Sequence, residues 1–151
     1  MFEMIQTITI DLDKSMAFGT AKIPADNPIF ADHFPDFPLL PGTMAVELTA
    51  QVAGTLSEKR FKQQYNLERW AILGMIRNAK FHLPVNLPAT LQLTAKLNRL
   101  DLSSAVLLVT AHKDNQLVLK GEIVMMMMED SPDLMNAIKA RQERLIRWRI
   151  I

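Results

Sequence analysis

Apolar and polar residues alternate along several segments of the chain, as they do in β-strands that cover a core with one face. The clearest case is residues 91–97, where leucine or alanine at every second position alternates with polar neighbours, as in a half-buried antiparallel strand. Residues 105–111 are nearly all apolar, which predicts a strand covered on both faces. In total the pattern predicts strands at residues 4–11, 18–23, 70–81, 91–97, 105–111 and 117–128.

One long segment follows the period of an α-helix instead. From Thr43 onward, apolar residues recur at steps of three and four, at Ala45, Leu48, Val52 and Leu56. Thr43 can cap the start of this helix. The charged residues from Glu58 onward indicate that the far end of the helix reaches solvent.

The C-terminal segment, residues 131–151, also predicts a helix. Ser131 is a suitable N-cap, and Pro132 suits the first helical position. The segment carries five basic and two acidic side chains, a balance of +3, whereas the net charge of the whole chain is +1. We therefore expect an amphipathic helix with a solvated basic side, which extends a domain formed by residues 1–130.

The predicted order is two strands, a long loop, one apolar helix and four strands. A long helix followed by a run of antiparallel strands is typical of an α+β fold in which the sheet wraps around the helix. A length of 151 residues, with 49% hydrophobic and 22% charged residues, fits a single globular domain. Periodicity does not choose among the α+β sandwiches that share this order.

Composition excludes several classes of function. The absence of cysteine excludes disulfide frameworks, thiolate metal sites and cysteine nucleophiles. The small net charge gives no reason to expect nucleic acid as a partner. No apolar run approaches the roughly 20 residues that a membrane-spanning helix needs, and the first residues lack the features of a signal peptide. These features favour a cytoplasmic protein.

The segment between the second strand and the helix is dense in proline, with five prolines in residues 24–41. Proline removes a backbone donor and fixes φ, so this segment is expected to be a long ordered loop, and such loops often carry function. It contains His33 and leads through Gly42 into the helix, where free N–H groups favour developing negative charge. Glu47 follows on the helix, with Gln51 one turn further as a partner for its carboxylate. The arrangement suits chemistry beside a carbonyl group.

Each of these residues alone has a simpler interpretation. A single histidine before Phe-Pro is usually a turn residue or a hydrogen-bonded core residue. A single glutamate on a helix usually faces solvent, and a single glycine usually marks a turn. His82 and His112 have no carboxylate or histidine at the spacing of metal ligands, so no metal is expected. Spacing by itself leaves these alternatives open.

Taken together, the residues resemble a known motif. The pattern is His33-Phe34-Pro35-x-x-Pro38-x-x-Pro41-Gly42-x-x-x-x-Glu47-x-x-x-Gln51, preceded by Asn27-Pro28-Ile29-Phe30. It is similar to the active-site motif of the 3-hydroxyacyl-[acyl-carrier-protein] dehydratases of bacterial type II fatty acid synthesis, which are FabZ-like enzymes with a hot-dog fold. The remaining strands follow the family's order to about Met128.

The resemblance implies a role for each residue. His33 would be the general base that removes a proton from C2 of a 3-hydroxyacyl thioester, and Glu47 would be the acid that helps the C3 hydroxyl leave as water. The backbone N–H of Gly42 would polarise the thioester carbonyl, and Gln51 would belong to the same oxyanion or substrate-binding group. In that family the two side chains come from different subunits of a dimer. The substrate arrives on the phosphopantetheine arm of acyl carrier protein, and no metal or organic cofactor takes part.

Some positions depart from the family's pattern. Asp36 stands where the family usually has glycine, and Thr43 stands where a branched aliphatic residue is commoner. Glu47 resembles the plain dehydratase branch rather than the branch that also isomerises the double bond. The resemblance implies a role in fatty acid synthesis or in a related polyene or polyketide-type pathway, and the departures point away from housekeeping fatty acid synthesis and toward a paralogous dehydratase of the latter kind. Arg77 and Lys80 are candidates for contact with an acidic carrier protein.

Two other functions use the same residues. One is hydrolysis of the thioester, with Glu47 activating a water molecule. The other is a non-catalytic module that binds an acyl group or the carrier protein. Separately, the run from Met125 to Met128 would place two methionines on each face of the last strand, where core or dimer packing is expected.

Overall fold

The computed structural model describes residues 4–129 and parts of the C-terminal segment, namely Ser131, Asn136, Ala137, Lys139, Ala140, Glu143 and Ile146. The predicted helix over residues 131–151 therefore falls largely outside the described residues. The elements are β1 (Ile5–Asp11), β2 (Met16–Ile23), the 3₁₀ helix η2 (Pro28–Phe30), α1 (Gly42–Tyr65), β3 (Trp70–Phe81), β4 (Ala89–Leu100), β5 (Ser104–Lys113) and β6 (Gln116–Met128).

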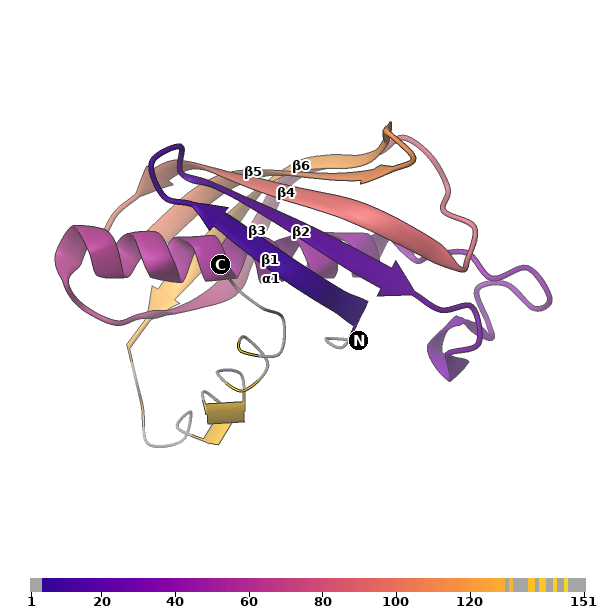
Figure 1. The fold of residues 1–151 in the computed structure, drawn as a ribbon, viewed down its shortest axis with the longest axis horizontal. Coiled ribbons are helices and arrows are strands. Elements are labelled where there is room, and N and C mark those ends of the chain that lie inside the picture. Colours follow the sequence, from indigo (N-terminus) through magenta and orange to yellow (C-terminus); the bar gives the residue numbers. More distant parts are fainter. Residues whose placement is uncertain are drawn as a thin grey trace.

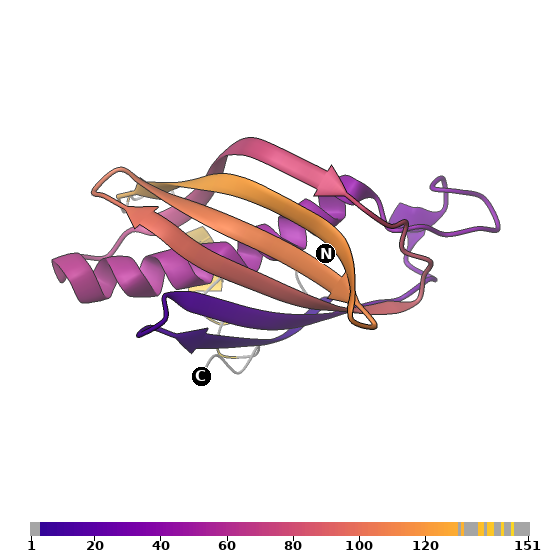
Figure 2. The ribbon, with the colours of Figure 1, turned by 90° about the horizontal axis from the view of Figure 1, so that it is seen from above.

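The six strands form one antiparallel sheet in the order β1-β2-β4-β5-β6-β3. The sheet curves around α1, which lies along its inner face (Figures 1 and 2). Strands β1 and β3 are the two edges. The segment between β2 and α1 extends beyond the end of the sheet in both views. The predicted α+β order and the sheet wrapped around one long helix are confirmed.

Helix α1 packs against the sheet through the apolar face that the sequence pattern predicts. Ala45, Leu48, Val52 and Leu56 are each no more than 2% exposed. They belong to a core that also takes in the inward-facing side chains of the central strands. Gly19 on β2 allows the close approach, because a Cβ there would lie 2.7 Å from a methyl carbon of Val52. Packing against the core therefore fixes the position of α1 relative to the sheet, and with it the position of the helix start.

Three details differ from the sequence prediction. Thr43 does not cap α1, because the helix begins at Gly42 and its N-cap is Pro41, which has no side-chain hydrogen bond to offer. Strand β2 begins at Met16, two residues earlier than predicted. Strand β5 is not covered on both faces: its alternate residues are buried and the intervening ones are half-buried. Apolar residues on the outer face of β5 explain that error, since composition does not reveal which face is covered.

The methionine run behaves as predicted. Met125 and Met127 are buried, whereas Met126 and Met128 are more than 40% exposed on the outer face of the sheet. Edge strand β3 is also largely exposed along its length. None of the helices among the described residues is both long and apolar enough to cross a membrane.

Candidate active site

The proline-rich loop is ordered by hydrogen bonds at both of its ends. At the start, the Asn27 side chain caps η2 by accepting a hydrogen bond from the Ile29 amide at 3.0 Å, and Phe30 is buried. At the end, the Leu40 amide donates to the Val85 carbonyl at 2.9 Å. The Leu87 amide donates back to a loop carbonyl at 3.1 Å. The loop is therefore anchored to the segment that connects β3 and β4.

His33 is held in one orientation by this loop. Its backbone N–H donates to the Phe30 carbonyl, and its carbonyl accepts from the Leu39 amide at 2.7 Å. Its ring Nδ1 lies 3.1 Å from the Leu39 carbonyl oxygen. A carbonyl only accepts, so Nδ1 must carry the proton in this bond, and Nε2 of the neutral ring keeps a lone pair. His33 is thus oriented as a base that acts through Nε2.

The departure at Asp36 has a backbone explanation. Phe34 and Phe37 exchange two backbone hydrogen bonds of 2.9 Å, which close a tight turn over Pro35 and Asp36. Asp36 has φ 59°, in the left-handed region. Proline followed by a residue with positive φ is the requirement of a type II turn, and glycine meets it with least strain. Aspartate is one of the few other residues that tolerate this conformation.

This turn yields a prediction about stability. Replacing Asp36→Gly should raise the free energy of unfolding by up to about 1 kcal/mol, because it relieves the left-handed strain. Replacing Asp36→Val should lower it by about 1–2 kcal/mol. Exposed Asp32, four residues earlier, has no positive φ and is the matched control. Asp32→Gly should be destabilising through chain entropy. Urea unfolding of the three variants measures these differences, and equal losses at both positions would contradict the explanation.

His33 and Gly42 share one pocket of about 390 Å³. Its other lining residues come from the end of the loop, the first turns of α1, the end of β3, the segment after it and β6: Leu39, Leu40, Ala45, Phe81, His82, Leu83, Pro84, Val85 and Val118. The walls are mainly apolar, so a charge that develops inside is poorly solvated by water and depends on fixed donors. The structure therefore brings together the predicted base and the predicted carbonyl-polarising amide.

Gly42 is the first residue of α1 and stands at the positive end of the helix. The helical hydrogen bonds begin with the amides of Met44 and Ala45, which donate to the Pro41 carbonyl. The Gly42 amide precedes this ladder and is one of the donors that a helix start leaves without an intrahelical partner. A Cβ on Gly42 would lie 2.7 Å from a ring carbon of Phe81. Glycine is therefore required here for the ring to pack against the helix start.

Glu47 does not line the pocket that contains His33. It lies half-buried on α1, where the Gln51 side-chain amide donates to its carboxylate at 2.5 Å. The predicted pairing of Glu47 with Gln51 is confirmed. Because that bond engages one carboxylate oxygen, the other is the one available to a substrate. Within a single chain, the predicted acid is therefore not among the residues that line the pocket of the predicted base.

Three further residues lie in surroundings that the sequence does not reveal. His82 follows β3 directly and lines the pocket beside His33. The sequence argument considered His82 only as a metal ligand and did not place it near His33. Arg77 forms an ion pair with Glu122 at 3.1 Å. Lys80 is exposed. Among the described residues, no three histidine, aspartate or glutamate side chains gather closely enough to hold a metal ion.

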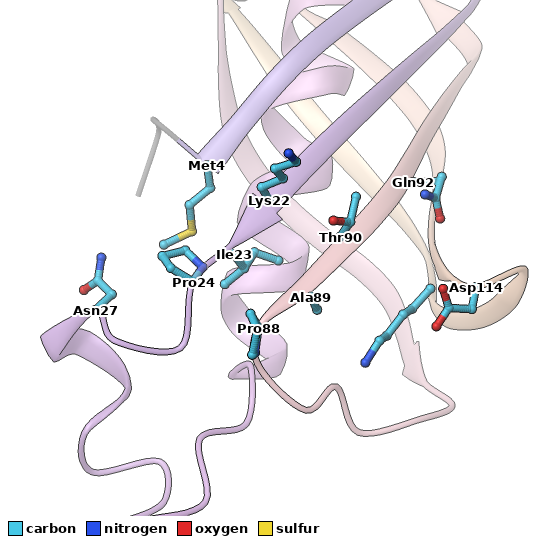
Figure 3. Close-up of a pocket in the computed structure, with 11 residues that line it drawn as sticks. Met4, Lys22, Ile23, Pro24, Asn27, Pro88, Ala89, Thr90, Gln92 and Asp114 are labelled. Carbon is cyan, nitrogen blue, oxygen red and sulfur yellow. The ribbon is translucent and has the colours of Figure 1, made fainter.

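A larger hollow of about 960 Å³ opens at the ends of β2 and β4 (Figure 3). Lys22, Thr90 and Gln92 line it together with apolar residues such as Ile23 and Pro88. None of the predicted catalytic residues lines it. Its charged lining residues are Lys22, Lys113 and Asp114, and neither His33 nor Gly42 reaches it, so the smaller pocket at His33 is the candidate active site.

Comparison with known proteins places the chain among dehydratases. The family model described as ApeI-like, ApeI dehydratase, matches residues 9–122. A 3-hydroxyacyl-[acyl-carrier-protein] dehydratase FabZ from Solibacter usitatus is 30% identical over 139 residues, which cover 91% of this chain and 85% of that protein. A protein of the same name from Chlamydia trachomatis serovar L2 is 28% identical over 77% of this chain and 75% of its own length.

Solved structures agree on the fold. The dehydratase heterocomplex ApeI:P from Xenorhabdus doucetiae has a TM-score of 0.66 at 15% identity, covering 91% of this chain and 90% of that chain. A putative thioesterase, yhdA from Lactococcus lactis, has a TM-score of 0.64 at 18% identity, covering 83% of this chain and 94% of its own. At these identities the likeness concerns the fold alone, and the hot-dog architecture is confirmed.

Proposed function

The chain belongs to the ApeI-like dehydratase family, and from that premise we propose that it converts a 3-hydroxyacyl thioester on acyl carrier protein to the trans-2-enoyl thioester. The observation that carries the proposal is the orientation of His33. Its Nδ1–H is engaged by the Leu39 carbonyl, which leaves Nε2 as a base in the same pocket as the Gly42 amide.

The proposed reaction uses three groups of the protein. Nε2 of His33 takes a proton from C2, while the Gly42 N–H donates to the thioester oxygen on which negative charge develops. The Glu47 carboxylic acid gives its proton to the C3 hydroxyl, and the C3–O bond breaks to release water. The electron pair from C2–H becomes the new C2=C3 bond. Gln51 positions Glu47 by holding one of its carboxylate oxygens.

The separation of Glu47 from the His33 pocket supports a site built by two chains. Edge strand β3 leaves its outer hydrogen-bonding groups without a neighbouring strand among the described residues. It also exposes Ile72, Met75 and Ile76 by 46%, 57% and 49%. We propose that a second copy pairs along β3 and that Glu47 of the partner subunit completes the site. Homodimerisation follows from this proposal, and the cytoplasmic location stays a prediction.

A product analysis tests the reaction. Purified protein would be incubated with 3-hydroxyacyl carrier proteins of differing chain length and unsaturation, and the thioesters examined by mass spectrometry. We expect loss of one water from the bound acyl group. Release of the free acid would indicate a thioesterase, the activity after which the structural neighbour from Lactococcus lactis, a putative thioesterase, is named. Binding of the carrier protein without any product would indicate a non-catalytic module. The preferred substrate decides between fatty acid synthesis and a polyene or polyketide-type pathway.

A further inference from the structure

The loop that carries His33 combines negative charge with exposed apolar side chains. Residues 24–41, the acidic loop, contain three exposed aspartates and neither lysine nor arginine: Asp26, Asp32 and Asp36. Three large apolar side chains of the loop are each more than half exposed: Ile29, Phe34 and Phe37. No ion pair between described residues involves any of the aspartates. Exposed apolar surface with charge around it is typical of an interaction site, and a partner that fits here is basic and apolar.

The C-terminal end of the chain has the complementary composition. Residues 144–149, the arginine segment, contain three arginines, three apolar residues and no acidic residue: Arg144, Leu145, Ile146, Arg147, Trp148 and Arg149. Its charge of +3 is opposite to the −3 of the acidic loop. The family model matches residues 9–122, so membership of the family does not account for the arginine segment.

Within one chain, these two segments belong to opposite ends of the fold. Ile146 lines a hollow of about 400 Å³ together with Lys62 and Trp70, which lie in the last turn of α1 and at the start of β3. The acidic loop instead leads into the first turn of α1, and the 24 residues of that helix span roughly 36 Å. Figure 2 shows the loop beyond one end of the sheet and the end of α1 beyond the other.

Pairing of two copies along β3 brings the opposite ends together. A two-fold axis perpendicular to the sheet pairs the two β3 strands antiparallel and keeps both copies of α1 on one side. The start of β3 in one copy then lies beside the end of β3 in the other. Trp70 at the start lines the hollow of Ile146, and Phe81 at the end lines the pocket of His33. Both hollows also take lining residues from α1, so they open on the same side of the sheet.

We propose that the arginine segment of the partner subunit docks on the acidic loop. This inference rests on the proposed function, because it uses the dimer that pairs along β3. Guanidinium groups bind carboxylates through charge-assisted hydrogen bonds. Ile146 is 78% exposed and offers an apolar contact to the exposed rings of Phe34 and Phe37. The Phe34 ring stacks on the His33 ring with their centroids 4.5 Å apart, so docking on the loop restrains the surroundings of the base.

Cross-linking tests which chain supplies the segment. The chain has no cysteine, so introduced cysteines are the only thiols that a short bismaleimide can join. Chains with Ala31→Cys and chains with Ile146→Cys would carry different affinity tags, and mixed dimers would be purified through both tags. We expect a covalent dimer. Lys14→Cys, at an exposed residue of the turn between β1 and β2, replaces Ala31→Cys as the control and should give none. Absence of the covalent dimer overturns the inference. Joining of Ala31→Cys to Ile146→Cys within one doubly substituted chain, at the mass of a monomer, also overturns it.

A charge exchange tests the attraction itself. The tail variant changes three residues to glutamate: Arg144, Arg147 and Arg149. The loop variant changes Asp26→Arg and Asp32→Arg, and retains Asp36 because its φ is positive. We expect amide hydrogen exchange of the acidic loop to be about tenfold faster in the tail variant, and to return toward the original rate when both sets are combined. A control variant changes three exposed lysines to glutamate and should leave the rate unchanged: Lys14, Lys96 and Lys120. Unchanged exchange in the tail variant, or no recovery in the combination, contradicts the docking.

These measurements need no substrate, so their outcome is separate from that of the proposed reaction. A dimer that dehydrates the thioester but forms no cross-link leaves the proposed function standing and overturns the docking alone. A cross-linked dimer without dehydration does the reverse. Sedimentation of the protein with phosphatidylglycerol vesicles, lost in the tail variant while loop exchange stays unchanged, would overturn the docking and assign the arginine segment to a membrane surface.

Discussion

Replacing His33→Ala should reduce turnover about 10²- to 10⁴-fold while the protein stays folded, because it removes the base that takes the C2 proton. The ring is half-exposed and contributes one hydrogen bond to the Leu39 carbonyl, so its loss should leave the core intact. Glu47→Gln should cause a loss of the same order, since an amide cannot donate a proton to the leaving hydroxyl. Steady-state rates on a 3-hydroxyacyl thioester, with thermal unfolding as a check of folding, measure both.

The chain offers a matched control for the histidine. His112 is half-buried on β5 and does not line the pocket, so His112→Ala should keep turnover close to that of the unmodified protein. Near-normal dehydration by His33→Ala would refute the assignment of the base. Equal losses in His33→Ala and His112→Ala, with lowered thermal midpoints in both, would attribute the effect to folding.

Periodicity predicts most of the fold because burial follows it. The bounds of β3, Trp70–Phe81, agree with the sequence prediction, since Pro84 and Pro88 end the strand where the pattern does. The predicted start of α1 at Thr43 is one residue too late. The N-cap is Pro41, which makes no side-chain hydrogen bond, so no capping side chain marks the first residue. Sequence also predicted the association of Glu47 with Gln51, since residues four apart on a helix are neighbours.

Contacts between distant segments lie beyond a single sequence. The ion pair of Arg77 with Glu122 depends on the register of β3 against β6, which no local pattern encodes. The same register places Lys120 opposite Lys80. His82 reaches the pocket because its amide bonds to Val118, again across these strands. The preference for glycine or aspartate at position 36 is explained only by its φ of 59°, because an aspartate in the sequence does not by itself predict a turn type.

Mixing two inactive variants should restore activity if each site draws on two chains. In a dimer of His33→Ala with Glu47→Gln, one of the two sites would combine the intact His33 of one chain with the intact Glu47 of the other. Random exchange of equal amounts makes half of the dimers mixed, so about a quarter of all sites should recover. The other sites lack one or both groups. The recovery is large because each variant alone is expected to retain only about one part in 10² or less.

The experiment requires proof that the mixed dimer forms. The two variants would carry different affinity tags, be co-expressed and be purified through both tags in succession. The turnover of the purified mixed dimer would then be compared with the turnover of each parent variant. Mixing His33→Ala with the double variant His33→Ala, Glu47→Gln is the matched control, because no exchange of those chains creates a complete site. Mixed dimers without recovered activity would mean that His33 and Glu47 act within one chain. Since Glu47 does not line the pocket at His33 of the same chain, that result would indicate that α1 or the loop moves. Because every dimer that passes both tags is mixed, recovery near half of the sites instead assigns the acid to the partner subunit and makes dimer formation a condition of catalysis.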